Sequence, residues 1–375
     1  MRGRNGLRPK WGGADLSLTS KGLADKSDAD SSNLVRLMAQ RIVTVFVLAA
    51  LLSGCGGNPW MEPVPSGPQP EPTRGITGLP GTLNPTARAS ITRNEDPASG
   101  NGNGFVSAVR YNAAADTFAV DGLAFDGANV YRLDRSVQFG RGISAFASEA
   151  VIRDPLNGNE IPQLTHRALY GSNAGDTMRF AIVRTGAYVG YGFGGFIYQR
   201  DGGFSLPAPD AAGNRGQGNY SGSYAGLRDF SGSGAQDEEV PELEYTSADM
   251  SIVIDYDDFN DGLGVRVEQS NRRVFDIDGN DITATIVDLL PGDATALPVL
   301  VNPTLGPGQT DASGEFTGTL VPLGGGGSVG TYYAVMGGEN AADIVGIITF
   351  DPVADGRFTG VNVRETGGFV VTRNN

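Results

Sequence analysis

The C-terminal region of the chain begins with the stretch Tyr220-Ser221-Gly222-Ser223-Tyr224-Ala225-Gly226-Leu227-Arg228. Glycines at this spacing are typical of a strand that curves sharply. Outward from it, short runs rich in Val, Ile, Thr, Tyr and Phe alternate with Gly, Asn and Asp, which predicts many strands and tight turns. The predicted strands are Tyr220–Arg228, Asp249–Tyr256, Leu263–Glu268, Ile282–Leu289, Gly314–Val321, Gly330–Met336, Asp343–Phe350 and Gly367–Arg373. About eight antiparallel segments can close a small barrel and so remove exposed sheet edges.

A second group of strand-like runs lies upstream, between Phe105 and Phe204. The predicted strands there are 105–111, 117–120, 129–133, 178–183 and 188–198, with the last two joined in a hairpin through Thr185-Gly186. Aromatic residues occupy both faces of the last run, since Phe196 and Tyr198 alternate with Phe193. We interpret this run as a strand covered on both sides by core packing, with an aromatic binding groove as the alternative. The fold class predicted from the sequence is therefore all-β, with a sheet domain followed by a small antiparallel barrel.

Short glycine-rich phrases recur in the C-terminal region. They are Tyr220–Tyr224, Gly314–Leu320, and Gly338–Gly346 followed by a strand that ends at Phe350. These phrases resemble the C-terminal barrel of transferrin-binding protein B-like lipoproteins, in which a late hairpin carries the pattern Gly-x-Asn-Ala-x-Glu-x-x-Gly. Asp343 stands where that family usually has Glu. The resemblance covers residues 219–375 and implies a barrel preceded by a handle-like sheet domain.

The only cysteine, Cys55, ends the run Leu51-Leu52-Ser53-Gly54-Cys55. Arg41 and the apolar residues 42–52 precede it, as in a secretory signal, and eleven apolar residues are too few to span a bilayer. The run resembles the bacterial lipobox, which implies cleavage before Cys55 and attachment of diacylglycerol and a further acyl chain such as palmitate. More than one chain would make anchoring stable. The alternative is a buried helix with Cys55 as a core thiol.

Composition divides the chain into six predicted segments. They are an over-extended start at 1–37, a lipoprotein signal peptide at 38–54, a flexible Pro/Gly-rich tether at 55–104, a β-rich handle-like domain at 105–204, a linker at 205–218 and the barrel at 219–375. The N-terminal region before the first β domain cannot pack a core, so we expect it to be disordered. By analogy with lipoprotein sorting, Gly56 rather than Asp after the cysteine favours the outer membrane.

The predicted mature chain is strongly acidic. Residues 1–54 hold 8 of the 28 basic and 4 of the 42 acidic residues, so the remainder has 20 and 38, a net charge of −18. This charge disfavours binding to nucleic acid and spreading over anionic lipid headgroups. It serves solubility, or alternatively it steers a basic partner.

Candidate catalytic and metal-binding residues are few. His166 is the only histidine, no Gly-x-Ser-x-Gly elbow accompanies it, and we predict a surface or sheet-face residue rather than a catalytic one. A zinc site built from Cys and His is excluded by count. The acidic runs Asp255–Gly262 and Asp276–Asp281 resemble calcium loops incompletely, so hairpin turns are the favoured interpretation. No catalytic residue, cofactor or metal site is therefore predicted.

These observations predict a lipid-anchored outer-membrane lipoprotein, at the cell surface or the periplasmic face, that is not an enzyme. The family resemblance implies capture of a ligand or protein partner, such as an iron or haem carrier, or of another nutrient. The alternative is a structural or adhesive envelope lipoprotein without a small-molecule ligand. Because a barrel of about eight strands is usually filled by side chains, partner contact is expected through loops.

Overall fold

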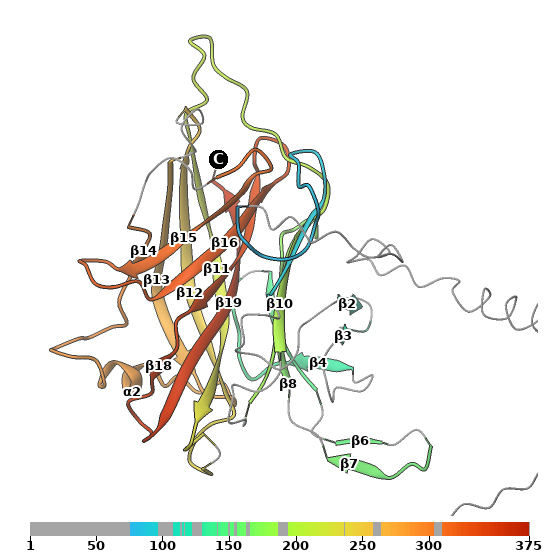
Figure 1. Ribbon diagram of the computed structural model, residues 1–375, viewed down its shortest axis with the longest axis vertical. Helices are drawn as coiled ribbons and strands as arrows, with labels where there is room; N and C mark the ends of the chain where they lie inside the picture. Colours follow the sequence, from blue (N-terminus) through green and yellow to red (C-terminus); the bar gives the residue numbers. More distant parts are fainter. Residues whose placement is uncertain are drawn as a thin grey trace, which may run out of the picture. The chain divides into compact units, whose positions relative to one another are not determined.

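The protein is described from a computed structural model. The described residues are 76–96, 108–112, 115, 117–121, 130–140, 142–148, 151–153, 156–162, 166–186, 194–235, 237–257, 264–303 and 310–374. Within them the fold is all-β, as predicted, with two large antiparallel sheets (Figure 1). In the same ranges, no helix has the length and apolar character needed to cross a bilayer. The expected signal peptide, Cys55 and most of the expected tether lie outside the described residues.

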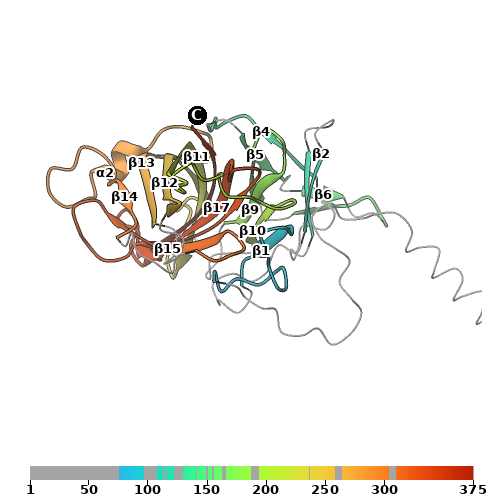
Figure 2. The same ribbon diagram turned by 90° about the horizontal axis from the view of Figure 1, so that it is seen from above.

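One sheet closes into a barrel. Its strand order is β11-β12-β13-β14-β15-β16-β17-β19, and β19 pairs back to β11, which gives eight strands in the ring (Figure 2). β18 pairs with the start of β19. The strands are β11 (Gln217–Gly232), β12 (Leu243–Asp255), β13 (Gly264–Phe275), β14 (Leu300–Val301), β15 (Glu315–Pro322), β16 (Gly330–Gly337), β17 (Asp343–Phe350), β18 (Val353–Ala354) and β19 (Val361–Arg373). The predicted barrel of about eight strands is confirmed.

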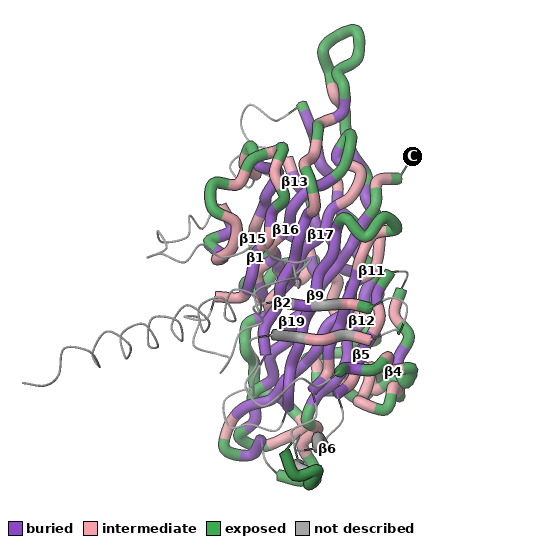
Figure 3. Tube along the Cα trace, turned by 90° about the vertical axis from the view of Figure 1, so that its right-hand side faces the viewer, coloured by how far each residue is buried: buried purple, intermediate pink, exposed green. Residues whose placement is uncertain are grey.

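Side chains fill the barrel. Figure 3 shows that long stretches of the barrel strands are buried. Its apolar core includes Tyr220, Tyr224, Met250, Ile252, Ile254, Val265, Val267, Leu300, Phe316, Leu320, Tyr332, Ile344, Ile348 and Phe369. Glycines on the inner face make room for the largest rings: a Cβ added at Gly367 would lie 2.1 Å from Cζ of Tyr224. The interior is thus a packed core, as expected for this strand number.

Gln269 interrupts this packed interior. It is fully buried on β13 beside Met250 and Leu300, and among the described residues neither polar atom of its amide has a hydrogen-bond partner. An unpaired buried amide costs roughly 1–3 kcal/mol. We therefore expect Gln269→Met to raise the free energy of unfolding by about 1 kcal/mol, measured by denaturant titration at unchanged m-value. A fall in stability would contradict this reading, and Gln217→Met, at an exposed position, is the control.

The second sheet lies against the barrel. Its order is β1-β10-β9-β8-β5-β4-β3-β2, and β6 and β7 form a separate two-stranded ladder. The strands are β1 (Ile91–Asn94), β2 (Ala108–Asn112), β3 (Thr117–Asp121), β4 (Tyr131–Asp134), β5 (Ile143–Ala147), β6 (Val151–Arg153), β7 (Glu160–Pro162), β8 (His166–Ser172), β9 (Met178–Thr185) and β10 (Gly194–Arg200). Phe196 and Tyr198 face one core cluster and Ile197 faces another, so β10 is buried on both sides, as predicted for the run 188–198. Residues 188–193 of that run lie outside the described residues.

Two local predictions are wrong. Residues 282–289 are not a strand: Thr283–Val287 form the short helix α2, because the Asp281 carboxylate accepts the Thr283 N–H and the Asp288 N–H donates to the Ala284 carbonyl. The eighth barrel strand is instead the two-residue β14. Residues 91–94 fall in the predicted flexible tether, yet they form β1, which pairs along its whole length with β10.

Candidate functional site

The two sheets share an apolar interface. The barrel contributes outward-facing residues of β11, β17 and β19, among them Leu227, Ile347 and Val370. The second sheet contributes Phe180 and Phe196, all within one buried cluster. A Cβ at Gly368 would lie 2.3 Å from the Phe180 ring, so the barrel wall and the sheet approach as closely as a glycine allows. The barrel and the sheet therefore pack as one core rather than as separate modules.

A buried ion pair crosses this interface. Arg93 of β1 donates from Nε and Nη2 to the two carboxylate oxygens of Glu315 on β15, at 2.6 and 2.7 Å, and both side chains are 0% exposed. Burial alone would lower the pKa of Arg93, but the hydrogen bonds and charge of Glu315 raise it above its ordinary value. A bidentate pair of this kind fixes orientation as well as distance. It therefore holds β1 to the barrel in one register.

A second ionic cluster centres on Asp229 of β11. Arg364 of β19 donates to both of its oxygens, at 3.1 and 2.6 Å, and Arg184 of β9 lies 3.5 Å away. Arg184 also pairs with Glu95, at 2.9 Å, and donates to the Thr366 hydroxyl. This cluster is a second ionic link between the second sheet and the barrel.

Arg200, at the end of β10, binds backbone rather than a carboxylate. Its guanidinium donates to the carbonyls of Ser313 and Met336 in the barrel, both at 2.8 Å, and to those of Thr86 and Ala89 before β1, at 2.9 and 2.7 Å. Burial lowers the pKa of Arg200 to about 10, although the negative charges of Glu315 and Asp311 act to raise it. Arg200 thus ties three chain segments together at one end of the barrel.

The other end of the barrel is lined by paired charges. Glu365 accepts hydrogen bonds from Tyr224, at 2.6 Å, and Thr246, at 2.9 Å, while Glu244 accepts from Arg228 and Arg357, each at 2.5 Å. Burial, and then the charge of Glu365, raise the pKa of Tyr224 well above its ordinary value. These groups satisfy one another, which favours a structural role for them over a ligand site.

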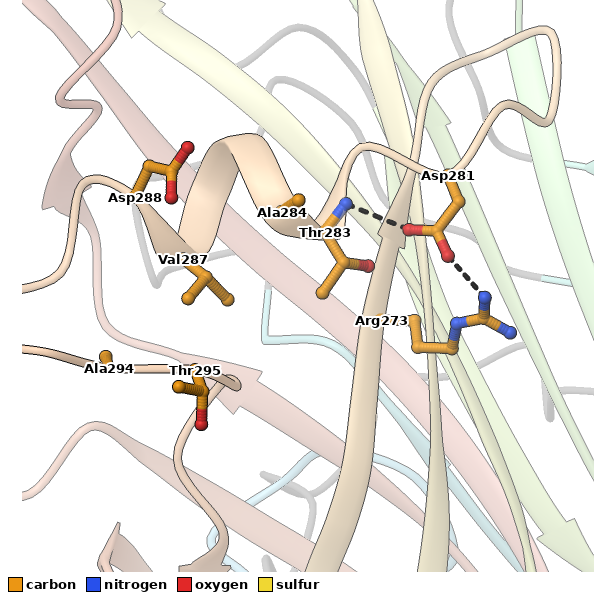
Figure 4. Close-up of a pocket in the computed structure, with 8 residues that line it drawn as sticks. All are labelled: Arg273, Asp281, Thr283, Ala284, Val287, Asp288, Ala294 and Thr295. Carbon is orange, nitrogen blue, oxygen red and sulfur yellow. Dashed lines mark hydrogen bonds and ion pairs between the residues drawn. The ribbon is translucent and has the colours of Figure 1, made fainter.

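A groove lies at that same end, on the outside of the barrel beside α2. It measures about 590 Å³ and is lined by Arg273, Asp281, Thr283, Ala284, Val287, Asp288, Ala294 and Thr295 (Figure 4). Val287 is buried, whereas Ala284, Ala294 and Asp288 are exposed. Figure 4 shows Asp281 facing Arg273, with which it forms an ion pair, and Asp288 at the other end of the helix.

The residues singled out from the sequence do not gather in the groove. His166 is fully buried on β8, edge-on to the Tyr131 ring at 6.3 Å, so it is a sheet-face residue and not a surface one. The Asp276 carboxylate accepts the N–H groups of Asp278 and Asn280, and that of Asp257 accepts those of Arg215 and Gly216. The Asp276 contacts are those of a turn, whereas the Asp257 contacts join two segments far apart in the sequence, and residues 258–262 of that acidic run lie outside the described residues. Within the described ranges, no group of three or more His, Cys, Asp or Glu is placed to hold a metal.

Sequence reasoning missed the buried arginines and the groove. Arg93 and Glu315 are 222 positions apart, and nothing local in either neighbourhood signals the other. The groove depends on α2, which has the composition of a strand. The available signal was the run Ile282-Thr283-Ala284-Thr285-Ile286-Val287-Asp288, which follows Asp281 and is followed by Pro291-Gly292, a helix start and stop pattern.

Comparisons with known proteins give only weak likenesses. No protein-family model matches the chain, and no curated protein matches it. Similar solved structures include transferrin-binding protein B of Neisseria meningitidis serogroup B, at 11% identity and a TM-score of 0.28. Another is a double mutant of the transferrin-binding protein B of Haemophilus parasuis, at 13% identity and a TM-score of 0.28. Each match covers 79% of this chain, but only 58% of the Neisseria protein and 61% of the Haemophilus protein. A protein of unknown function from Nostoc punctiforme matches at 12% identity and TM-score 0.19, over 76% of this chain and 94% of that one. Likeness at this level carries no argument about this chain.

Proposed function

We propose that this chain is a lipid-anchored outer-membrane lipoprotein that binds a ligand or protein partner without catalysing a reaction. The observation that carries the binding role is the filled barrel, fixed to a second sheet by the buried pair of Arg93 and Glu315. Such a scaffold holds its connecting loops in place, and loops on rigid scaffolds are where binding residues concentrate. Its packed interior directs a partner to the outer surface. The motif resemblance of residues 219–375 supports capture linked to iron, haem or another nutrient.

Anchoring through Cys55 makes a direct prediction. Because the thiol would be the acylated atom, we expect Cys55→Ala to move the protein from the membrane fraction to the soluble fraction and to abolish its labelling by radioactive palmitate. Ser53→Ala keeps a small residue before the cleavage point and is the matched control, expected to remain labelled and membrane-bound. Continued labelling of Cys55→Ala would refute the anchor.

The side of the membrane on which the protein lies separates surface capture from a periplasmic role. Protease treatment of intact cells, followed by immunoblotting, is expected to remove the protein, while a periplasmic marker stays intact until the cells are ruptured. Protection of the protein in intact cells would contradict surface capture. Growth of a strain that lacks the protein then distinguishes iron capture from adhesion. Loss of an adhesin would reduce attachment and leave growth on scarce iron normal.

A further inference from the structure

We propose that the end of the barrel beside α2 is a docking surface for a cationic protein segment that carries apolar side chains. We call this surface the α2 end and define it by the described residues of four connections, at 233–235 with 237–242, 276–299, 323–329 and 351–360. The inference rests on the proposed binding function and deepens it, because it names the surface and the chemistry of the partner.

The four connections form one continuous surface. A Cβ added at Gly234 would lie 2.6 Å from the Thr359 carbonyl oxygen, and one at Gly356 would lie 3.4 Å from Leu289, so the first, second and fourth connections touch. The Leu323 N–H donates to the Val299 carbonyl, and the Asp351 N–H donates to that of Val329. These contacts bring the third connection against its neighbours, and the groove beside α2 lies within the surface.

This surface exposes apolar side chains. Leu289, Leu323 and Val353 are 45%, 60% and 58% exposed, and they are three of the six large apolar residues that are exposed within the described ranges. Val287 and Ala284 add apolar side chains to the lining of the groove. Exposed apolar groups gathered at one place and surrounded by polar residues mark an interaction surface.

Its charge is almost entirely negative. The four connections contain eleven Asp and Glu and a single basic residue, Arg357, whose guanidinium is bound to Glu244 and Asp355. The exposed carboxylates are Asp237, Glu238, Glu239, Glu242, Asp278, Asp281, Asp288, Asp293 and Asp351. Of these nine, within the part of the chain that the structure describes, only Asp281 forms an ion pair. The connections that expose the apolar side chains therefore also present carboxylates that are available to a cation.

The approach of the chain to β1 does not cover this end. The segment before β1 is held at the opposite end, where Arg200 binds the Thr86 and Ala89 carbonyls together with those of Ser313 and Met336. β11 spans the barrel between the two ends with 16 residues, a length of about 50 Å. The described part of the chain that leads toward the predicted anchor thus lies far from the α2 end.

Charge complementarity selects the occupant. A second copy of the chain would bring carboxylates against carboxylates in a symmetric contact, and an anionic lipid surface would be repelled in the same way. A small cation would leave the exposed leucines and valine uncovered. A basic protein segment with apolar side chains satisfies both features, since its charges can pair with the carboxylates while its apolar groups cover the exposed leucines and valine.

The test uses the full mature chain, purified from membranes in detergent, and a fluorescein-labelled peptide of alternating arginine and leucine. We expect saturable binding by fluorescence anisotropy, and weaker binding of a peptide with serine in place of leucine. Asp288→Asn/Asp293→Asn should weaken binding of the leucine peptide by about fivefold, the effect of losing two exposed ion pairs. Asp210→Asn/Glu339→Gln removes two exposed carboxylates at the opposite end and should leave binding unchanged.

A further variant, Leu289→Ser/Val353→Ser, separates contact from bulk charge attraction. It should weaken binding of the leucine peptide about tenfold and leave the serine peptide unaffected. Absence of binding, equal losses in the two carboxylate variants, or no effect of Leu289→Ser/Val353→Ser would each overturn the proposal. None of these results bears on anchoring, which the Cys55→Ala fractionation tests separately.

Discussion

Glu315→Gln is expected to lower the free energy of unfolding by about 3–5 kcal/mol, which is the usual cost of leaving one partner of a buried ion pair uncompensated. Arg93 is 0% exposed, and without the carboxylate its guanidinium keeps only the hydrogen bonds that it donates to the Leu79 and Thr82 carbonyls within the described residues. Water cannot replace the lost negative charge without opening the interface between the sheet and the barrel. The change is measured by denaturant titration, with unfolding monitored by far-ultraviolet circular dichroism.

Two further variants make this result specific to burial. Glu268→Gln breaks the pair between Arg266 and Glu268, whose side chains are 56% and 32% exposed, and should change stability by no more than about 0.5 kcal/mol. Arg93→Met/Glu315→Leu removes both buried charges and should recover most of the stability, because an apolar pair of similar volume is often equivalent to a buried ion pair. A loss in Glu315→Gln no larger than that in Glu268→Gln would show that the pair is not a clamp.

Gly367→Ala is expected to destabilise the barrel by about 3 kcal/mol, at the upper end of the cost of overpacking a core. The added Cβ would lie 2.1 Å from both Cζ and Oη of Tyr224. The ring cannot swing aside freely, because its hydroxyl donates to Glu365 at 2.6 Å inside the barrel. The thermal midpoint and the denaturant midpoint should both fall.

The matched control for this prediction is Gly327→Ala, where no heavy atom lies within 4 Å of the added Cβ. We expect that variant to retain the stability of the parent. Replacing the ring in Tyr224→Leu/Gly367→Ala should restore part of the stability lost in Gly367→Ala, since the space needed by the new Cβ is then free. Equal stability of Gly367→Ala and Gly327→Ala would contradict the close packing described for the barrel interior.

The sequence predicts the barrel well and the contacts around it poorly. Seven of the eight predicted C-terminal strands correspond to barrel strands, because each carries its own signal of β-branched, aromatic and glycine residues. The run Ile282–Leu289 fails for a local reason: its β-branched composition favours a strand, but the Asp281 carboxylate starts a helical turn. β14 is missed because two residues, Leu300 and Val301, are too few to show a pattern.

The elements that join the sheet to the barrel are harder still to predict. β1 has only four residues, in a region rich in Pro and Gly, and its partner β10 lies about a hundred positions later. Arg200 reads as an ordinary charged residue at a strand end, yet it is buried among carbonyls. Such roles depend on segments that meet only in the folded chain, so no window of sequence contains them.

Closure of the barrel by its last strand has a consequence for how the protein is made. β19 pairs with β11 over 13 residue pairs from Tyr220 with Arg373 to Gly232 with Val361, and it also pairs with β17. Until residues 361–373 have been synthesised, both β11 and β17 present an unpaired edge, the kind of edge that recruits strands from other chains. The two edges stay exposed until residues 361–373 have been synthesised and paired, so the pace of this closing step, rather than the stability of the finished barrel, sets the exposure of the nascent chain to aggregation.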